Sequence, residues 1–271
     1  MRYLLATFIF LLTGCEQQFR TTDALCDAHP ELCVSLNNGD GQCRNQRTDL
    51  IWQRFESKQH KNELNLYTEL QFTHDYLRCI ERVSGIEHIE QKERKTNRVD
   101  SLLATQEIAR ELQQTLSTST NPEVIYYLWR LGDEKAKYRF LELEGSTELN
   151  TPYLQFALAS FYTSEDKDKT LELLHYGLSL VESSDNLEPR LISTIATIYH
   201  QSGHHAEAYT WSKVATHFNL PVSDDARLRR LYPLTASEYR YYNELASVIA
   251  KDINRGRYKA GHYIYSSSSA G

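Results

Sequence analysis

The stretch YHQSGHHAEAYTW, from Tyr199 to Trp211, decides how the C-terminal half of this chain folds. Gly203 is its fifth residue, and glycine is the residue that most often ends a helix. Tyr199 before it, and Ala208 and Trp211 after it, have the spacing of side chains on two helices that pack together. We therefore predict a helix that ends near Gly203, a polar turn, and a second helix that folds back on the first.

The three histidines of this stretch raise the alternative of a metal site. Zinc needs three or four ligands that converge at about 2 Å. His200 and His204 are four residues apart, but Gly203 between them weakens the helical geometry that would align them. We favour a polar turn opened by His204 and His205, and we predict no metal and no other cofactor. A metal-binding envelope protein using these three histidines is kept as an alternative.

Prolines punctuate the C-terminal half of the chain. Proline suits the first turn of a helix and not its interior, and Asn121 and Thr151 precede two of the prolines as candidate N-caps. Successive prolines are separated by 30, 37 and 32 residues, a spacing typical of helical-hairpin repeats. The four prolines are Pro122, Pro152, Pro189 and Pro221.

Two of these segments can be laid over one another. Pro152 matches Pro189, Leu158 matches Ile195, Ala159 matches Ala196, Tyr162 matches Tyr199 and, after one gap, Gly177 matches Ala215. This pattern of large, small and aromatic residues resembles the tetratricopeptide repeat and its Sel1-like relative. The resemblance covers about residues 152–220 and implies stacked helix hairpins, in which small residues let helices approach closely.

The repeat resemblance also implies a concave binding surface, lined by the first helix of each hairpin. Plain solvent exposure is the alternative for every position in this lining. For the two aromatic residues, burial by the preceding hairpin is a further alternative. Carried over position by position, the lining is Tyr153, Phe156, Ser160, Thr163, Arg190, Ser193, Thr197 and His200.

The N-terminus has the form of a secretory signal. Arg2 supplies a positive charge, and the apolar run from Tyr3 to Leu12 is too short to span a membrane, which takes about 20 residues. Leu-Thr-Gly-Cys, ending at Cys15, resembles the lipobox of bacterial lipoproteins. The alternative is an ordinary signal peptide with a chance cysteine.

The lipobox resemblance implies cleavage before Cys15 and acylation of both its thiol and its new amino group. Several acyl chains would hold the protein firmly on a membrane, whereas one chain binds only reversibly. In that family an aspartate after the cysteine favours retention in the inner membrane, and here the residue is Glu16. We therefore expect the protein in the outer membrane, lipid-anchored and facing the periplasm.

Four further cysteines predict two disulfides, because an even number in an oxidising compartment reads as a disulfide framework. A zinc site is the alternative, but the spacing lacks the close cysteine pairs of structural zinc sites. Three connectivities are possible and the sequence does not choose among them. Our preference is Cys26–Cys33 with Cys43–Cys79, which would staple an N-terminal coil to a helix that carries Cys79.

The predicted fold is all-α, a TPR/Sel1-like array of helical hairpins preceded by a disulfide-stapled helical region. With its lipobox, its cysteine-rich N-terminal region and its degenerate repeats, the whole chain also resembles an uncharacterised family of putative bacterial lipoproteins. This resemblance implies no known activity. The predicted segments are a signal peptide (1–14), a lipid anchor and short tether (15–25), a cysteine-containing loop and helices (26–95), the repeat region (96–253) and a disordered tail (254–271).

Composition and motifs argue against several classes of function. The chain has 30 basic and 36 acidic residues, whereas nucleic-acid binding needs a basic face. It lacks the common motifs of hydrolases, metalloproteases and phosphate loops, and Ser164-x-x-Lys167 lacks the companion motifs of penicillin-binding enzymes. We therefore predict no enzyme, but a scaffold that binds a peptide or an envelope protein. A periplasmic enzyme acting on cell-wall material is the alternative.

Overall fold

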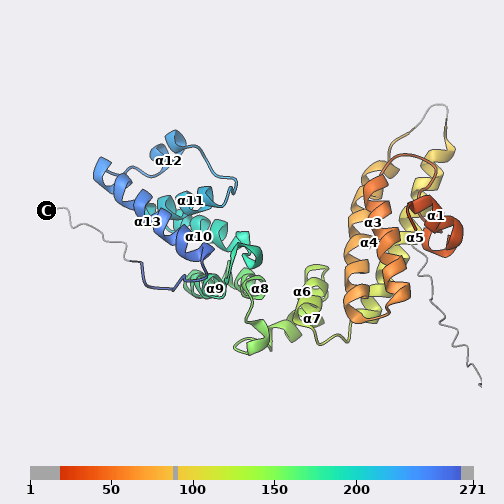
Figure 1. Cartoon of the computed structure of the whole chain (residues 1–271), viewed down its shortest axis with the longest axis horizontal. Coiled ribbons are helices and arrows are strands. Elements are labelled where there is room, and N and C mark those ends of the chain that lie inside the picture. The colour runs from red at the N-terminus through yellow and green to blue at the C-terminus, as the bar shows by residue number, and fades with distance from the viewer. Residues whose placement is uncertain (1–18, 88–90, 264–271) are drawn as a thin grey trace, which may run out of the picture. The chain divides into compact units, whose positions relative to one another are not determined.

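The computed structural model describes residues 19–87 and 91–263, and over these residues the chain is helical, without a strand (Figure 1). This confirms the predicted all-α class. The signal peptide (1–14), the proposed lipidation site Cys15 and residues 264–271 lie outside the described residues. None of the described helices has both the length and the apolar character needed to cross a bilayer. The chain divides into an N-terminal unit, Met1–Ser119, and a C-terminal unit, Thr120–Gly271.

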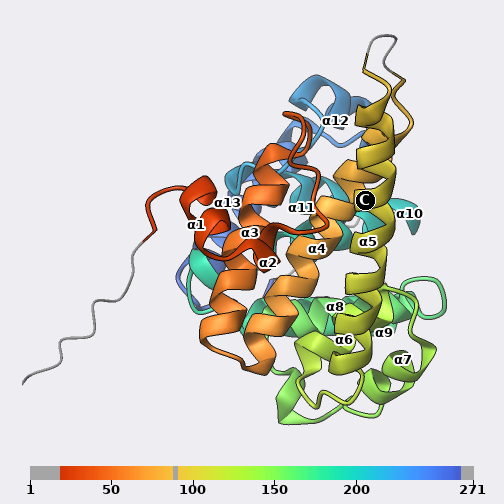
Figure 2. The same cartoon turned by 90° about the vertical axis from the view of Figure 1, so that its right-hand side faces the viewer.

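The N-terminal unit is built on three long helices that lie side by side (Figure 2). The middle helix, α4, packs against both of the others, and two short helices lie against α3. Leu50 of α3 and Tyr76 and Ile80 of α4 are among the fully buried residues of the core between them. The helices are α1 (Thr22–Ala28), α2 (Pro30–Cys33), α3 (Arg44–Gln59), α4 (Glu63–Ser84) and α5 (Glu93–Leu116).

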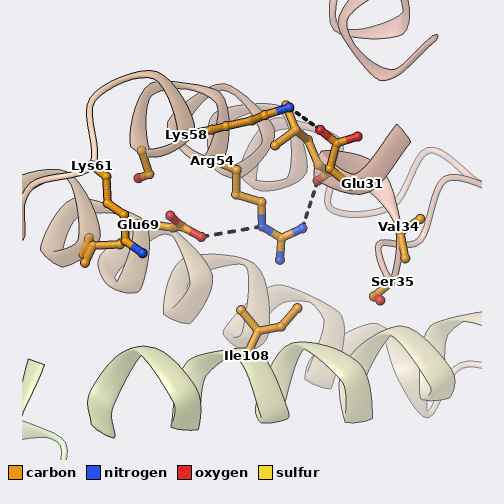
Figure 3. A pocket seen from close by; sticks show the side chains of 11 residues that line it. Glu31, Val34, Ser35, Arg54, Lys58, Lys61, Glu69 and Ile108 are labelled. Carbon is orange, nitrogen blue, oxygen red and sulfur yellow. Dashed lines mark hydrogen bonds and ion pairs between the residues drawn. The ribbon is translucent and has the colours of Figure 1, made fainter. Parts of the chain in front are cut away.

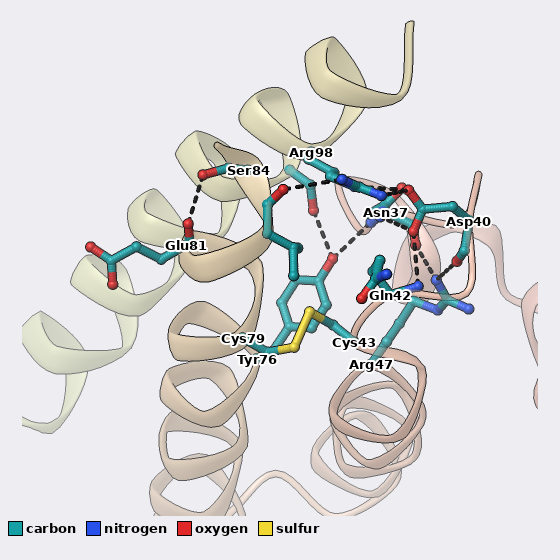
Figure 4. Close-up of a disulfide and its surroundings, with 12 residues drawn as sticks. Asn37, Asp40, Gln42, Cys43, Arg47, Tyr76, Cys79, Glu81, Ser84 and Arg98 are labelled. Carbon is teal, nitrogen blue, oxygen red and sulfur yellow. Dashed lines mark hydrogen bonds and ion pairs between the residues drawn. A yellow bond between two sulfur atoms is a disulfide. The ribbon is translucent and has the colours of Figure 1, made fainter. Parts of the chain in front are cut away.

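Two disulfides cross-link this unit, with the connectivity that we preferred from the sequence. Cys26 of α1 is bonded to Cys33 at the end of α2. Cys43, which precedes α3, is bonded to Cys79 in α4, 36 residues along the chain. The second bond therefore ties the loop between α2 and α3 to the middle helix (Figure 4).

A buried ion pair holds the same loop against α5. Asp40 and Arg98 are 2.8 Å apart, and their side chains are only 3% and 1% exposed. Burial by itself would raise the pKa of Asp40. However, hydrogen bonds from the Gln42 N–H and from the side chains of Arg98 and Asn37 outweigh it, so that the pKa lies below its ordinary value. Arg98 also donates to the carbonyl of Val83 in α4.

Tyr76 extends this polar network into the core (Figure 4). Its hydroxyl accepts a hydrogen bond from the Asn37 N–H at 2.8 Å and lies 2.9 Å from the Ser101 hydroxyl. Ser101 in turn donates to the carbonyl of Ser35. The irregular segment between α2 and α3 is therefore held by side chains from both α4 and α5.

The predicted boundary at residues 95 and 96 needs correction. The predicted repeat region begins at residue 96, but α5 packs along α4 and belongs to the N-terminal unit, which ends at Ser119. Of the five buried residues of α5, Arg98, Ser101 and Thr105 are polar, and Ala109 and Leu116 are apolar. Apolar periodicity alone therefore could not assign this helix to either unit.

The C-terminal unit consists of successive helix pairs, with α6 against α7, α8 against α9 and α10 against α11. Across the pairs, α8 contacts both α6 and α10, α9 contacts α10, and α13 packs on α11. Two short 3₁₀ turns, Thr147–Leu149 and Ser184–Asn186, precede α8 and α10. The helices are α6 (Pro122–Arg130), α7 (Glu134–Leu141), α8 (Pro152–Tyr162), α9 (Lys167–Ser179), α10 (Pro189–Gln201), α11 (His205–His217), α12 (Asp225–Leu231) and α13 (Ala236–Asn254).

Three of the four prolines begin helices, as the sequence predicts. Pro122, Pro152 and Pro189 are the first residues of α6, α8 and α10, and the side chains of Asn121 and Thr151 accept hydrogen bonds from the first turns of their helices. Pro221 does not begin a helix, since it lies in the loop between α11 and α12.

The helix–turn–helix prediction for residues 199–211 is confirmed. Helix α10 ends at Gln201 and α11 begins at His205. Between them Gly203 has a positive φ of 74°, a conformation that L side chains rarely adopt. Ala208 and Trp211 are fully buried, as the packing pattern requires.

The start of the predicted disordered tail is ordered, because residues 254–263 pack on the C-terminal unit. Tyr258 is 4% exposed, and its hydroxyl lies 2.7 Å from Nδ1 of His175, a ring whose pKa burial lowers to about 4. Gly256 has a φ of 62°, and a Cβ there would lie 2.5 Å from the carbonyl oxygen of Glu182. A glycine and a tyrosine within a polar tail gave no periodic signal of this contact.

Candidate functional site

The predicted binding surface lies on the first helices of two neighbouring pairs, α8 and α10. Tyr153 and Phe156 of α8 are partly buried, and Arg190 of α10 reaches over both. Its guanidinium carbon is 4.3 Å from the centre of the Phe156 ring and 5.7 Å from that of Tyr153. We call these three residues the aromatic–arginine cluster.

Glu188 fixes the position of Arg190. The guanidinium donates from Nε to one carboxylate oxygen at 2.7 Å and from Nη2 to the other at 2.9 Å. The bond to Glu188 raises the pKa of Arg190. Burial opposes ionisation of Glu188, but Arg190 outweighs it and lowers the pKa of Glu188. The Arg190 side chain is still 43% exposed, so a held cation is presented at the surface.

Tyr153 is also covered from the preceding helix pair. Its ring packs edge to face on Tyr126 of α6 at 5.7 Å, and burial raises the pKa of its hydroxyl. The alternative of burial by the preceding hairpin therefore holds in part for this residue. The cluster joins side chains from α8 and α10, and Tyr126 connects it to α6.

The hydroxyl residues of the predicted lining are turned toward their own helices. Ser160 donates to the carbonyl of Ala157, Thr163 to that of Ala159 and Thr197 to that of Ser193. Ser193 likewise contacts the carbonyls of Pro189 and Arg190. Each hydroxyl has one proton, which is used in the bond to its own helix. Only hydrogen-bond acceptors are therefore presented to solvent by the exposed residues Ser160, Ser193 and Thr197.

Each of the three histidines of the opening stretch lies against a tyrosine. Nδ1 of His200 lies 3.2 Å from the hydroxyl of Tyr232, against which His205 also packs edge on. His204 stacks on Tyr199. Over residues 19–87 and 91–263, no three His, Cys, Asp or Glu side chains are grouped so that they could hold a metal ion. The geometry therefore does not support the alternative of a metal site at these histidines.

A second candidate site, which was not predicted from the sequence, lies in the N-terminal unit. A pocket of about 400 Å³ opens between α3, α4 and α5, with Arg54 at its base and Lys58 and Lys61 beside it (Figure 3). Part of the signal was present in the spacing, because residues 54 and 58 are one helical turn apart and place two basic side chains on one face of α3. Lys61 follows in the loop after this helix. Arg54 is only 8% exposed, and burial of an arginine is not visible in a sequence.

A model of the family described as "Protein of unknown function (DUF2989)" matches residues 12–213, which is most of the chain. The chain therefore belongs to this family. Searches of curated proteins and of solved structures returned no match.

Proposed function

We propose that this member of the DUF2989 family is a lipid-anchored protein of the outer membrane that faces the periplasm. It binds an envelope protein, or a peptide segment of one, and it carries out no catalysis. Its C-terminal unit is an array of TPR/Sel1-like hairpins, and the first helices of the second and third helix pairs form the binding surface. The anchor is Cys15, by its resemblance to the lipobox.

The aromatic–arginine cluster is the observation that carries this proposal. Tyrosine and arginine are enriched at the centres of protein interfaces, where a few such residues provide most of the binding energy. Arg190 is already held by Glu188 and lies over Phe156. A partner would therefore lose little entropy in ordering it, which favours affinity.

Close helix packing supports the repeat assignment. A Cβ on Gly177 of α9 would lie 3.0 Å from the Leu191 side chain of α10 and 3.1 Å from Cβ of Gln155 in α8. Gly177 is therefore the small residue at a contact of three helices. Small residues at such contacts are what the repeat pattern requires.

Replacing Arg190 with alanine is expected to weaken partner binding at least tenfold, because it removes the exposed part of a central cluster. The measurement is the amount of envelope protein that co-purifies with the tagged chain after mild cross-linking. Arg227→Ala changes an exposed arginine of α12 and is the matched control, for which no loss is expected. Equal co-purification with both variants would count against this surface, provided that circular dichroism shows both to be folded.

Replacing Cys15 with serine is expected to abolish incorporation of labelled palmitate and to release the protein from the membrane fraction. The reason is that the acyl chains on this residue are the proposed anchor. Cys26→Ser and Cys33→Ser together are the control, since those cysteines are disulfide-bonded. Unchanged labelling after Cys15→Ser would refute the anchor.

A further inference from the structure

The pocket in the N-terminal unit has apolar walls and a charged base. Leu66 of α4 and Ile108 of α5 form part of its walls, and Arg54 of α3 lies at the base (Figure 3). A volume of about 400 Å³ falls within the range of small-molecule sites, which are mostly apolar with a few placed polar groups.

One nitrogen of the Arg54 guanidinium has no partner in the described parts of the chain. Nη1 donates to the carbonyl of Leu32 at 2.9 Å, and Nε lies 4.0 Å from the Glu69 carboxylate. Nη2 is buried without a hydrogen bond, and in Figure 3 it points toward Ile108, which lines the pocket. The side chain as a whole is 8% exposed.

An unpaired donor on a buried cation is costly to maintain. The guanidinium gives up its hydration on burial, and a buried donor without an acceptor forfeits the energy of a hydrogen bond. Burial lowers the pKa of Arg54 and the Glu69 carboxylate opposes this, but arginine stays charged at neutral pH. The arrangement is that of a site whose remaining acceptor comes from outside the chain.

The charges that line the pocket select the charge of the ligand. Glu31 is bonded to Lys58, and Glu69 lies beside Arg54. Lys61, exposed at the rim, has no ion pair with any residue that the structure describes. The lining is therefore positive by one charge, which suits a monoanion.

We propose that this pocket binds a small monocarboxylate with an apolar substituent. Its carboxylate accepts a hydrogen bond from Nη2 of Arg54 after a small movement of the covering side chains, since this atom is buried in the free chain. Its substituent packs against Leu66 and Ile108. Guanidinium groups are well matched to carboxylates. Such a ligand comes from either of two sources, a short fatty acid or the C-terminus of an apolar peptide. The proposal does not depend on the binding surface of α8 and α10.

The test is a titration of residues 15–271 with candidate ligands. The protein carries Cys15→Ser, so that it has no acyl chains and needs no detergent, which would compete with the ligand for the pocket. Octanoate is compared with octanamide, which has the same substituent but no charge. Methyl NMR signals of Leu66 and Ile108 report binding. Octanoate is expected to shift both signals saturably and to bind at least tenfold more tightly than octanamide. No saturable shift, or equal affinity for the two compounds, would overturn the proposal.

Substitutions separate the role of Arg54 in ligand binding from its role in folding. Arg54→Met is expected to abolish octanoate binding and Arg54→Lys to weaken it about tenfold, whereas Arg110→Met, at an exposed arginine of α5, leaves it unchanged. If Arg54→Met does not fold, Ile108→Trp fills the pocket from the opposite helix and is expected to abolish binding. Binding that persists in a folded Arg54→Met, or in Ile108→Trp, contradicts the assignment.

A second pair of compounds distinguishes the two possible sources of the ligand, a short fatty acid and a peptide C-terminus. N-acetyl-leucyl-leucine is compared with its C-terminal amide under the same conditions. Tighter binding of the free dipeptide than of octanoate supports a peptide C-terminus, and the reverse order supports a fatty acid. Failure of both carboxylates to bind overturns the proposal.

Discussion

Replacing Arg98 with methionine is expected to destabilise the N-terminal unit by about 3–5 kcal/mol, the usual cost of removing one partner of a buried ion pair. The change leaves the Asp40 carboxylate, 3% exposed, without its counterion. It also removes the bond from Arg98 to the carbonyl of Val83. The measurement is amide hydrogen exchange of peptides from α4 and α5, which reports the opening free energy of this unit.

The control for this variant is Arg110→Met on the same helix. Arg110 is 70% exposed and pairs with the exposed Glu107 one turn away, so its loss is expected to change stability by no more than about 0.5 kcal/mol. A similar loss of protection in the two variants would show that the Asp40–Arg98 pair does not stabilise the unit.

The pH dependence of the same unit follows from the lowered pKa of Asp40. Because the folded pKa is below the unfolded one, the pair contributes fully at pH values above the unfolded pKa of about 3.9. The contribution is lost as the pH falls through the folded pKa. Protection of α4 and α5 should therefore decline on acidification below about pH 4, and less so in Asp40→Asn, which is already without the charge.

Removing the Cys43–Cys79 disulfide with paired serine substitutions is expected to cost about 4 kcal/mol, from the chain entropy of the loop that it closes. Removing Cys26–Cys33 in the same way is expected to cost about 2.5 kcal/mol, since that bond spans 7 residues and not 36. The free energy of unfolding of both variants can be measured by urea denaturation. A larger loss of unfolding free energy on removal of Cys26–Cys33, which closes the shorter loop, would contradict the entropic account.

The helices of the C-terminal unit were largely predictable from local chemistry. Proline at a first turn, glycine at a helix end and an apolar period are signals carried by neighbouring residues. They located the starts of α6, α8 and α10 and the turn at Gly203. Pro221 gave a false signal because proline suits loops as well as helix starts.

The polar core and the pockets were not predictable in the same way. Asp40 and Arg98 are 58 residues apart, and an ion pair between a loop and a distant helix has no period in the sequence. Burial of Arg54 depends on how three helices pack. The contact of Tyr258 with His175 spans 83 residues and involves a segment whose composition suggests disorder.

For the predicted binding surface, the sequence placed the residues but could not orient them. All eight lie on α8 or α10 or at the ends of these helices. However, whether a serine faces a partner or its own helix is set by rotamer and local hydrogen bonding. The contact between Arg190 and Phe156 was likewise not foreseen, because it depends on the distance between two helices.

Photo-cross-linking in living cells tests the central claim most directly, namely that α8 and α10 present a binding surface. A cross-linking amino acid is placed at position 193 or 197, both exposed on α10, or at the exposed position 172 on α9 as a control. We expect one envelope protein to be captured from 193 and 197 and not from 172, with the capture reduced by Arg190→Ala. Capture of a protein from 172 with none from 193 or 197 would contradict the account.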